Sequence, residues 1–186
     1  MTSVRQDSVA RLERLGVPYF VTGSDAMAIH GVGFCQTNDI DFVLGIDPSL
    51  YDRVLRPAFE PAYLVATLLD TPSRWTGSAI WVAGAGKADL MIRKPDPWGA
   101  EALSRRVRTV DVELGEVWVS TLEDLLLAKL EWSEGVLDGL QGRDVHQLLL
   151  SSRPFDWAYM TGGQRCWRRL AAIRSWPCAG LSGSRT

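Results

Sequence analysis

The spacing of apolar residues at the start of the chain predicts an amphipathic helix. From Val4 to Leu15, apolar side chains recur at helical spacing among charged ones, and Gly16 follows as a stop signal. Three later segments also have helical patterns: 51–59, 121–132 and 143–150. The segment 121–132 begins with a near-capping box formed by Thr121 and Asp124.

Short apolar runs that end at glycine predict strands. The run 18–22 ends at Gly23 and leads into helix formers over 24–29, which is the order strand, turn, helix. The next strand, 39–44, ends at Gly45. Two further pairs of strands surround glycine-containing turns and predict hairpins. They are 78–83 with 88–92 around Gly84-Ala85-Gly86, and 107–114 with 116–119 around Gly115.

Two stretches lack a readable pattern. Residues 60–77 mix apolar side chains with proline and glycine and support no assignment. After Asp156 the sequence turns to paired glycines, crowded Cys, Trp and Arg, and a Gly/Ser/Arg end, so we expect disorder or poor packing there. A shifted reading frame in GC-rich DNA would give such a composition. We therefore expect a core over 1–120, a helical part over 121–156 and a disordered or aberrant tail over 157–186.

Composition places the chain among soluble globular proteins. Its 186 residues suffice for one domain, with or without a small addition, and for a sizeable core. The 20 basic and 22 acidic residues give a formal charge of −2, so no global basic field indicates nucleic-acid binding. No apolar run approaches the roughly 20 residues of a membrane span. Three cysteines without a CxxC pair and only two histidines favour a cytoplasmic protein without zinc.

Two carboxylates spaced two residues apart are the first sign of chemistry. Side chains alternate along a strand, so Asp39 and Asp41 point to one face while the apolar residues after them point to the other. Adjacent like charges are costly unless cations neutralise them, and Mg²⁺ prefers such hard oxygen ligands. Asp89, inside the apolar run 88–92, is the best third carboxylate, because neighbouring strands lie about 4.8 Å apart. The alternative is that Asp39 caps a strand and Asp89 lies on an exposed sheet face.

A Gly-Ser turn precedes the two carboxylates. A helix beginning at Ser24 offers unpaired backbone N–H groups and a favourable dipole to phosphate, and Gly23 allows close approach. A simple loop-to-helix cap is the alternative for the turn alone. Mg²⁺-dependent nucleotidyl transfer needs two divalent ions about 4 Å apart, which three carboxylates on neighbouring strands can hold. The turn and the carboxylates together therefore favour the handling of a triphosphate.

This combination resembles the DNA polymerase beta-like nucleotidyltransferase superfamily. It is similar in particular to the AbiEii-type nucleotidyltransferases, the toxin side of some type IV toxin-antitoxin systems, and to related bacterial nucleotidyltransferases. The resemblance runs from about residue 17 to residue 156. It rests on Gly23-Ser24, His30-Gly31, Thr37-Asn38-Asp39-Ile40-Asp41, Lys87-Ala88-Asp89-Leu90, Ala128-Lys129-Leu130-Glu131-Trp132 and Arg143-Asp144.

The resemblance implies an α+β fold, with a mixed β-sheet core, flanking helices and a small C-terminal helical part. It implies that Asp39, Asp41 and Asp89 are catalytic and bind two Mg²⁺ ions. By the same resemblance, Lys129 would reach the triphosphate and Asp144 would lie near the nucleotide.

Several of these residues also allow simpler roles. Lys129 suits an exposed helix position, and Asp144 suits an ion pair with Arg143. Lys87 shares a strand face with Asp89 and either contacts nucleotide phosphate or borders the acidic cluster.

For three further residues, a structural role is favoured over a functional one. His30 ends an apolar helix and suits a helix-end or core position better than acid–base chemistry. Trp75 and Trp81 are able to stack on a base, although core packing is favoured.

The chain departs from the family pattern before the second strand. Many relatives carry an arginine there, where this chain reads Phe34-Cys35-Gln36-Thr37, so a phosphate or strand-orienting contact is missing.

We therefore expect a cytoplasmic, Mg²⁺-dependent enzyme that moves NMP from an NTP to a hydroxyl on RNA such as tRNA, a protein or a small molecule. A cognate antitoxin is a further expected partner. The alternative is a catalytically eroded homologue that binds a nucleotide or a partner. A metal-dependent phosphohydrolase or nuclease is less well supported, because the chain lacks the histidine-rich ligands of many such sites.

Overall fold

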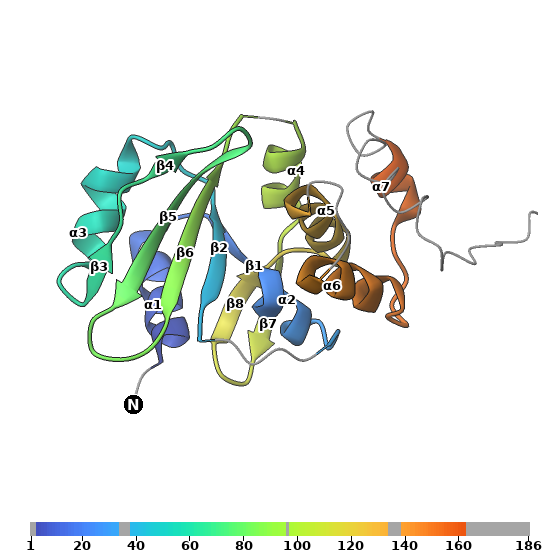
Figure 1. The fold of residues 1–186 in the computed structure, drawn as a ribbon, viewed down its shortest axis with the longest axis horizontal. Coiled ribbons are helices and arrows are strands. Elements are labelled where there is room, and N and C mark those ends of the chain that lie inside the picture. The colour runs from blue at the N-terminus through green and yellow to red at the C-terminus, as the bar shows by residue number, and fades with distance from the viewer. Residues whose placement is uncertain (1–2, 34–37, 96, 134–138, 163–186) are drawn as a thin grey trace, which may run out of the picture. The chain divides into compact units, whose positions relative to one another are not determined.

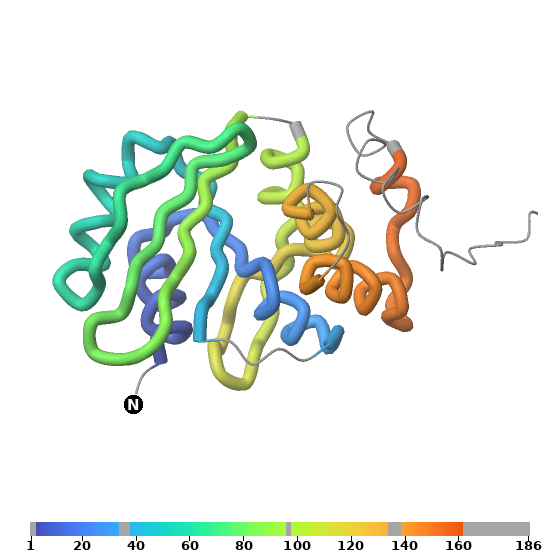
Figure 2. Tube along the Cα trace, in the orientation of Figure 1, coloured from blue at the N-terminus to red at the C-terminus, as the bar shows by residue number. Residues whose placement is uncertain are grey.

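The computed structural model describes residues 3–33, 38–95, 97–133 and 139–162. The chain divides into two compact units, Met1–Thr121 and Leu122–Thr186. In the described part of the chain, the first unit contains every strand and the second contains helices only. Figures 1 and 2 trace the chain through these elements. No helix among the described residues is long and apolar enough to cross a membrane.

A mixed eight-stranded sheet forms the centre of the first unit. Its strands are β1 (Tyr19–Thr22), β2 (Ile40–Leu44), β3 (Tyr63–Val65), β4 (Leu69–Asp70), β5 (Arg74–Trp81), β6 (Lys87–Arg93), β7 (Val107–Asp111) and β8 (Gly115–Val119). Seven of them lie in the order β3, β5, β6, β2, β1, β8, β7, and β4 pairs with β5. Strand β2 runs antiparallel to β1 and parallel to β6. This arrangement confirms the expected α+β class with a mixed sheet.

Helices flank the sheet and make up the described part of the second unit. The first unit has α1 (Val4–Leu15), α2 (Gly23–Ile29), the π-helix η1 (Tyr51–Leu55), α3 (Arg56–Phe59) and α4 (Pro97–Arg105). The second has α5 (Leu122–Trp132), α6 (Gly139–Leu149) and α7 (Trp157–Gly162).

Local signals in the sequence define both ends of α1. The Ser3 side chain accepts a hydrogen bond from the backbone of Gln6, whose own side chain accepts one from Ser3, which forms a complete capping box. The helix ends at Gly16, which adopts the left-handed conformation with φ of 64°. The predicted helix is thus confirmed at both ends.

The two faces of β2 differ around Asp41, although Val43, further along the same face as Asp41, is also buried. Ile40 and Phe42 are fully buried in the main core, together with residues from α1, η1 and α3. Their neighbours on β6, Ala88 and Leu90, are equally buried in the same core. Asp41 lies between these apolar positions on the strand and is only partly buried, because alternate side chains point to opposite faces.

Most predicted elements are present, with shifted ends. The segment 51–59 is helical as expected, although its first half is a π-helix. Both predicted hairpins are present as β5–β6 and β7–β8. Within the unassigned stretch 60–77 lie β3, β4 and the start of β5. Helix α6 begins at Gly139 rather than at the predicted residue 143.

Helix α4 is not among the elements predicted from the sequence. Pro97 lies at its first position, where proline is favoured, whereas Gly99 inside the helix weakens the pattern. Burial of Trp98 and Ala102 on one face stabilises the helix. This packing offsets the cost of the internal glycine.

The expectation of disorder from residue 157 onward is wrong for its first turns. Helix α7 occupies Trp157–Gly162, and the Asp156 carboxylate caps it by accepting a hydrogen bond from the backbone N–H of Tyr159 at 2.9 Å. The Tyr159 hydroxyl donates to Asp124 of α5 at 2.6 Å, and Met160 is fully buried. These contacts hold a segment whose composition alone indicated no structure. The rest of the predicted tail lies outside the described residues.

Candidate active site

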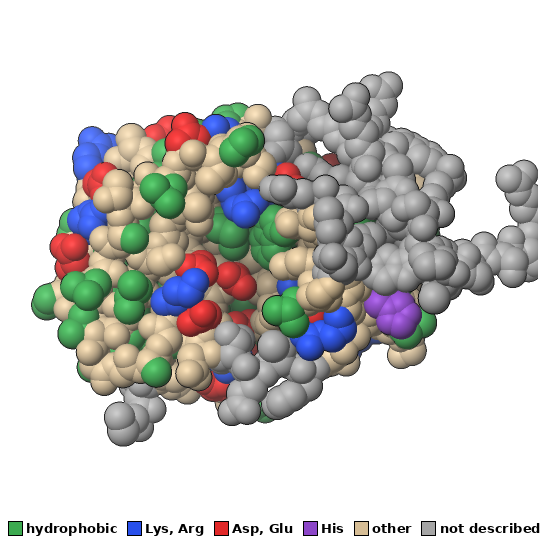
Figure 3. All heavy atoms as spheres, in the orientation of Figure 1, with side chains coloured by type: hydrophobic (Ala, Val, Ile, Leu, Met, Phe, Trp, Pro, Cys, Tyr) green, Lys and Arg blue, Asp and Glu red, His purple; other side chains and the backbone are tan. Residues whose placement is uncertain are grey.

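Strand register brings the predicted carboxylates together. Asp41 of β2 is the direct neighbour of Asp89 in the parallel β2–β6 pair, and Asp39 immediately precedes β2. The side chains of Asp39 and Asp89 are 44% and 22% exposed, so they lie at the surface of the sheet without being fully solvated. Figure 3 shows acidic side chains gathered beside a basic one over β2 and β6. Asp89 is therefore partly exposed on the sheet face that also carries Asp41.

The Gly-Ser turn touches the same cluster. Strands β1 and β2 pair antiparallel with Thr22 opposite Asp41, so Gly23 follows directly beside that carboxylate. Gly23 has φ of 66°, and a Cβ atom at this position would overlap Asp41 Oδ2. Glycine is therefore required here both by the backbone conformation and by the approach of the carboxylate. Ser24 is the next residue, in the first turn of α2.

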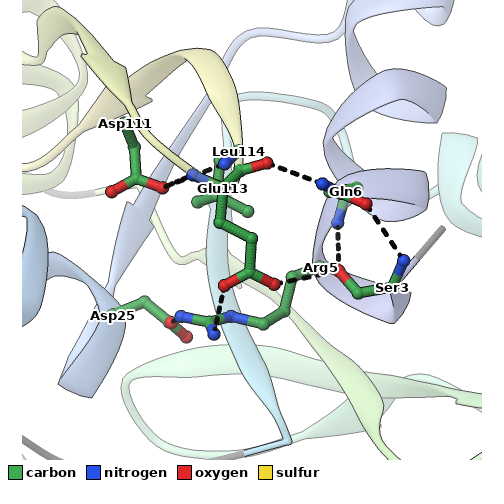
Figure 4. A network of polar contacts seen from close by, with 7 residues as sticks. All are labelled: Ser3, Arg5, Gln6, Asp25, Asp111, Glu113 and Leu114. Carbon is green, nitrogen blue, oxygen red and sulfur yellow. Dashed lines mark hydrogen bonds and ion pairs between the residues drawn. The ribbon is translucent and has the colours of Figure 1, made fainter. Parts of the chain in front are cut away.

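A buried acid that the sequence analysis did not single out fixes this turn. Asp25 is 2% exposed and forms an ion pair with Arg5 of α1 (Figure 4). Burial raises the pKa of Asp25 to about 6, against the opposing effect of the Arg5 charge. Arg5 also donates to Glu113 at 2.9 Å, in the turn between β7 and β8. The start of α2 is thereby tied to two other elements of the unit.

Lys87 lies inside the acidic cluster. Its Nζ is 2.6 Å from Asp89 Oδ2 and 4.0 Å from Asp39 Oδ2. Its backbone N–H donates to Asp39 Oδ1 at 3.2 Å. The hydrogen bond to Asp89 is the main cause that raises the pKa of Lys87. Of the two roles considered for Lys87, this geometry matches the one in which it borders the carboxylates.

Ser78 is a further neighbour of Asp89. It faces Asp89 across the β5–β6 hairpin, and its Oγ donates to Asp89 Oδ1 at 2.5 Å. Both carboxylate oxygens of Asp89 thus accept hydrogen bonds from the protein. Sequence reasoning missed Ser78, because the hairpin register that places it opposite Asp89 was not predicted.

The residues of the site suit Mg²⁺, though not as a ready-made three-ligand cage. Within the described ranges, no group of three or more His, Cys, Asp or Glu side chains is arranged to hold a metal ion. The three expected carboxylates thus do not form such a group, and Asp89 is in contact with Lys87 and Ser78. Mg²⁺ usually binds one or two carboxylates and completes its octahedron with water and substrate phosphates. Asp39 and Asp41 are two carboxylates of this kind.

In the second unit, two predicted nucleotide-binding residues contact each other. Lys129 Nζ is 2.7 Å from Asp144 Oδ2, and their side chains are 4% and 8% exposed. The alternative of an exposed helix lysine is therefore wrong. The alternative ion pair of Asp144 with Arg143 is present, at 3.4 Å.

The other residues considered have structural positions. His30 is the C-cap of α2, and its Nε2 lies 2.7 Å from the Ser120 carbonyl oxygen, which agrees with the helix-end interpretation. Trp75 and Trp81 pack against the main core, as favoured. Residues 34–37, where the resemblance led us to expect an arginine, lie outside the described residues.

Comparison with solved structures identifies the fold. A nucleotidyltransferase-like antigenic protein from Paracoccidioides brasiliensis aligns over 93% of this chain and 88% of its own, with 17% identity and a TM-score of 0.57. The antibiotic-resistance factor ANT(2'')-Ia aligns over 91% of this chain and 88% of its own, with 15% identity and a TM-score of 0.56. This chain has a nucleotidyltransferase-like fold.

A third similar structure agrees with this conclusion. A protein from Thermotoga maritima, assigned as a nucleotidyltransferase, aligns over 78% of this chain and 89% of its own, with 21% identity and a TM-score of 0.52. No protein-family model matches the sequence, and no curated protein matches it. The similarity is thus one of fold, and the chemistry has to be argued from the site.

Proposed function

We propose that this protein is a Mg²⁺-dependent nucleotidyltransferase that transfers NMP from an NTP to a hydroxyl acceptor and releases pyrophosphate. One observation carries the proposal: Asp41 lies between Asp89, its register partner on β6, and Gly23, whose Cα approaches its carboxylate. A turn suited to phosphate and a pair of carboxylates suited to a divalent ion therefore adjoin each other on a nucleotidyltransferase-like fold.

Each residue of this cluster has a role in the proposal. Gly23 and Ser24 would bind phosphate oxygens through the backbone N–H groups at the start of α2. Asp39 and Asp41 would hold Mg²⁺, with Asp89 as the third carboxylate of the site. When bound, the ion would neutralise phosphate charge and favour ionisation of the attacking hydroxyl.

The proposed step exchanges one phosphorus–oxygen bond for another. The acceptor oxygen forms a bond to the α-phosphorus, and the bond from that phosphorus to the bridging oxygen of the β-phosphate breaks. Pyrophosphate leaves with the electron pair of the broken bond. The hydroxyl proton passes to a carboxylate oxygen, for which we propose Asp89 or whichever carboxylate lies nearest the acceptor.

Lys129 and Asp144 remain candidate nucleotide-binding residues of the second unit. Because the ammonium of Lys129 is already paired with Asp144 at 2.7 Å, a phosphate would have to compete with this carboxylate. We also retain the AbiEii-type branch as a proposal, with RNA such as tRNA, a protein or a small molecule as acceptor and a cognate antitoxin as partner. These finer assignments rest on the motifs of the sequence.

Incubation with each labelled NTP, Mg²⁺ and total RNA or total protein tests the proposed activity. We expect label to be incorporated by the wild type and not by Asp39→Ala or Asp41→Ala, while circular dichroism shows that both variants are folded. Asp52→Asn, which changes an acid that is 66% exposed on η1, is the matched control and should keep activity. Full transfer by either cluster variant would contradict the mechanism.

A second candidate function is nucleotide binding without turnover. The engagement of both Asp89 oxygens by Lys87 and Ser78 favours it, because Asp89 is already bound to protein groups and not only available to a metal ion or an acceptor. Mg²⁺-dependent NTP binding by the wild type, without label transfer to any acceptor, would support this alternative.

A further inference from the structure

We propose that the hydroxyl acceptor belongs to a protein, which binds through its aliphatic side chains to an apolar strip beside the carboxylates. The strip consists of Leu64, Leu69 and Ile80, which lie on β3, β4 and β5. This inference rests on the proposed function and names the class of acceptor for it.

Strand β5 connects the strip to the carboxylate cluster. Ser78 lies opposite Asp89 in the β5–β6 pair, and Ile80 lies two positions further along β5, opposite Lys87. Side chains two positions apart on a strand point to the same face of the sheet, as do those of directly paired residues. Ile80 is therefore on the face that carries Asp89, one strand away from it.

The two leucines continue this face to the edge of the sheet. Leu64 lies opposite Ile80, and Leu69 lies opposite Thr76, which is two positions from Ser78. The side chains of Leu64, Leu69 and Ile80 are 67%, 62% and 48% exposed. Figure 3 shows hydrophobic side chains at the surface over β3 and β5, beside the charged side chains of the site. Exposed apolar patches of this kind mark interaction surfaces.

The order of the strands places the strip and the Gly-Ser turn on opposite sides of the carboxylates. Strand β1 leads into Gly23 and adjoins β2 with Asp41, after which come β6 with Asp89, then β5 and β3. In an in-line transfer, the attacking and the leaving oxygens lie on opposite sides of the phosphorus. With the triphosphate at the turn, the acceptor therefore reaches the carboxylates from the side of β5 and covers the strip.

The chemistry of the strip favours a protein over a nucleic acid. Phosphate backbones are bound by Lys and Arg, and bases stack on aromatic rings. From Thr76 to Ile80, β5 has uncharged residues only, and its aromatic residues Trp75 and Trp81 pack against the core. A small ligand, in turn, is usually enclosed by a pocket, whereas the strip is an exposed face. Aliphatic side chains of a protein segment match such a surface.

The width of the sheet predicts where the acceptor carries its aliphatic residue. Strand β3 is two strands away from β6, which is roughly 10 Å across the sheet. An extended segment covers this distance with about three residues. We therefore expect a Leu, Ile or Val about three positions from the Ser, Thr or Tyr whose oxygen forms the bond to the α-phosphorus, as pyrophosphate leaves and a carboxylate takes the hydroxyl proton.

Transfer from labelled NTP to total protein and to total RNA, each freed of the other, tests the class of acceptor. We expect label in protein, and a loss of about tenfold or more for Leu64→Thr/Ile80→Thr with unchanged Mg²⁺-dependent NTP binding. Threonine keeps strand propensity and adds no charge. Val110→Thr is the matched control, because it changes a valine of β7 that is 75% exposed, and it should keep full transfer. If the double variant does not fold, Leu64→Thr alone replaces it, with a smaller loss expected.

A display library of peptides tests the strip without catalysis. Each peptide has one Ser, Thr or Tyr among randomised positions, and the full chain without nucleotide is the bait. We expect the wild type and Val110→Thr to enrich peptides with an aliphatic residue about three positions from the hydroxyl. The variant Leu64→Thr/Ile80→Thr should not enrich them.

Label in RNA rather than in protein would overturn the inference and leave the proposed transfer standing. Protein labelling that the folded double variant keeps in full would do the same. No label in any acceptor, together with enrichment of the aliphatic peptides, would contradict the transfer and leave the strip as a protein-binding surface. If no aliphatic pattern is enriched, or if the double variant enriches the same peptides, the strip does not bind protein.

Discussion

Gly23 and Asp41 contact each other so closely that no side chain fits between them. Antiparallel pairing of β1 with β2 fixes this relationship, since Thr22 lies opposite Asp41 in the register. The Gly23-Ser24 turn, for which we propose phosphate binding, and the Asp41 carboxylate are thereby set by one strand pair. Changes at either residue should therefore affect both halves of the proposed site.

Substitution of Gly23 by alanine should abolish NMP transfer and destabilise the fold. The new methyl group would be strained by the positive φ and would also push the Asp41 carboxylate from its place. Gly16→Ala is the matched control, because Gly16 has φ of 64° but no atom lies within 4 Å of a Cβ added there. We expect the control to cost about 1 kcal/mol of unfolding free energy and to keep activity. Urea denaturation and labelled-NTP transfer measure the two effects, and equal losses in both variants would contradict the steric argument.

Ser78→Ala should lower the rate of NMP transfer while leaving the affinity for NTP nearly unchanged. The hydroxyl of Ser78 orients Asp89 through a hydrogen bond at 2.5 Å, and hydrogen bonds to charged groups contribute about 1.5 to 3 kcal/mol. A loss of about tenfold or more in kcat is expected, with rescue by Ser78→Thr. Ser104→Ala is the control, since its hydroxyl is exposed and donates to the Glu101 carbonyl oxygen, within α4. An unchanged kcat for Ser78→Ala would show that Asp89 needs no such support.

Breaking the Lys129–Asp144 ion pair on one side should destabilise the second unit. Both side chains are nearly fully buried, so Lys129→Met leaves a buried carboxylate without its main partner, at a cost of about 3 to 5 kcal/mol. The double variant Lys129→Met/Asp144→Leu should recover most of this loss, because two apolar groups then replace the pair. Urea denaturation of the two variants gives the comparison. A double variant less stable than the single one would indicate that the charges themselves are required.

The stability of the protein should carry a signature of Asp25 at acidic pH. Because burial raises its pKa from 3.8 to about 6, the native state keeps a proton that the unfolded chain has already released between those values. Asp25 therefore contributes fully to the unfolding free energy below about pH 4. This contribution falls by about 3 kcal/mol as the pH rises to about 6, and it stays low at higher pH. Asp25→Asn should lack this fall, whereas Asp70→Asn, at a carboxylate that is 65% exposed, should keep it. Denaturation from pH 3.5 to 7.5 measures the difference, and identical profiles for wild type and Asp25→Asn would contradict the assignment.

The parts of the site that follow from periodicity could be predicted from the sequence. The alternation of side chains along a strand is enough to place Asp39 and Asp41 on one face, and the hairpin around Gly84-Ala85-Gly86 brings Asp89 onto a strand of its own. Such inferences need only local geometry.

Contacts between distant segments could not be predicted in this way. The ion pair of Arg5 with Asp25 depends on how α1 docks on the sheet, and the hydrogen bond of Ser78 depends on the register of β5 against β6. Helix α7 forms because Tyr159 and Met160 find partners in the second unit, which composition does not reveal. Burial and register decide these features, and neither is visible in a single sequence.

The Ser78 hydroxyl, the Lys87 ammonium and the Asp89 carboxylate, which contact one another, all belong to a single β-hairpin, from Ser78 to Asp89. Its tip is open: Val82 is 58% exposed, and nothing lies within 4 Å of a Cβ added at Gly84. A loop inserted at Gly84 would thus lengthen the molecule without disturbing the chemistry, whereas one residue deleted between Lys87 and Asp89 would turn the carboxylate to the other face of the sheet. The hairpin tip is consequently a natural place to attach a reporter or an added recognition loop.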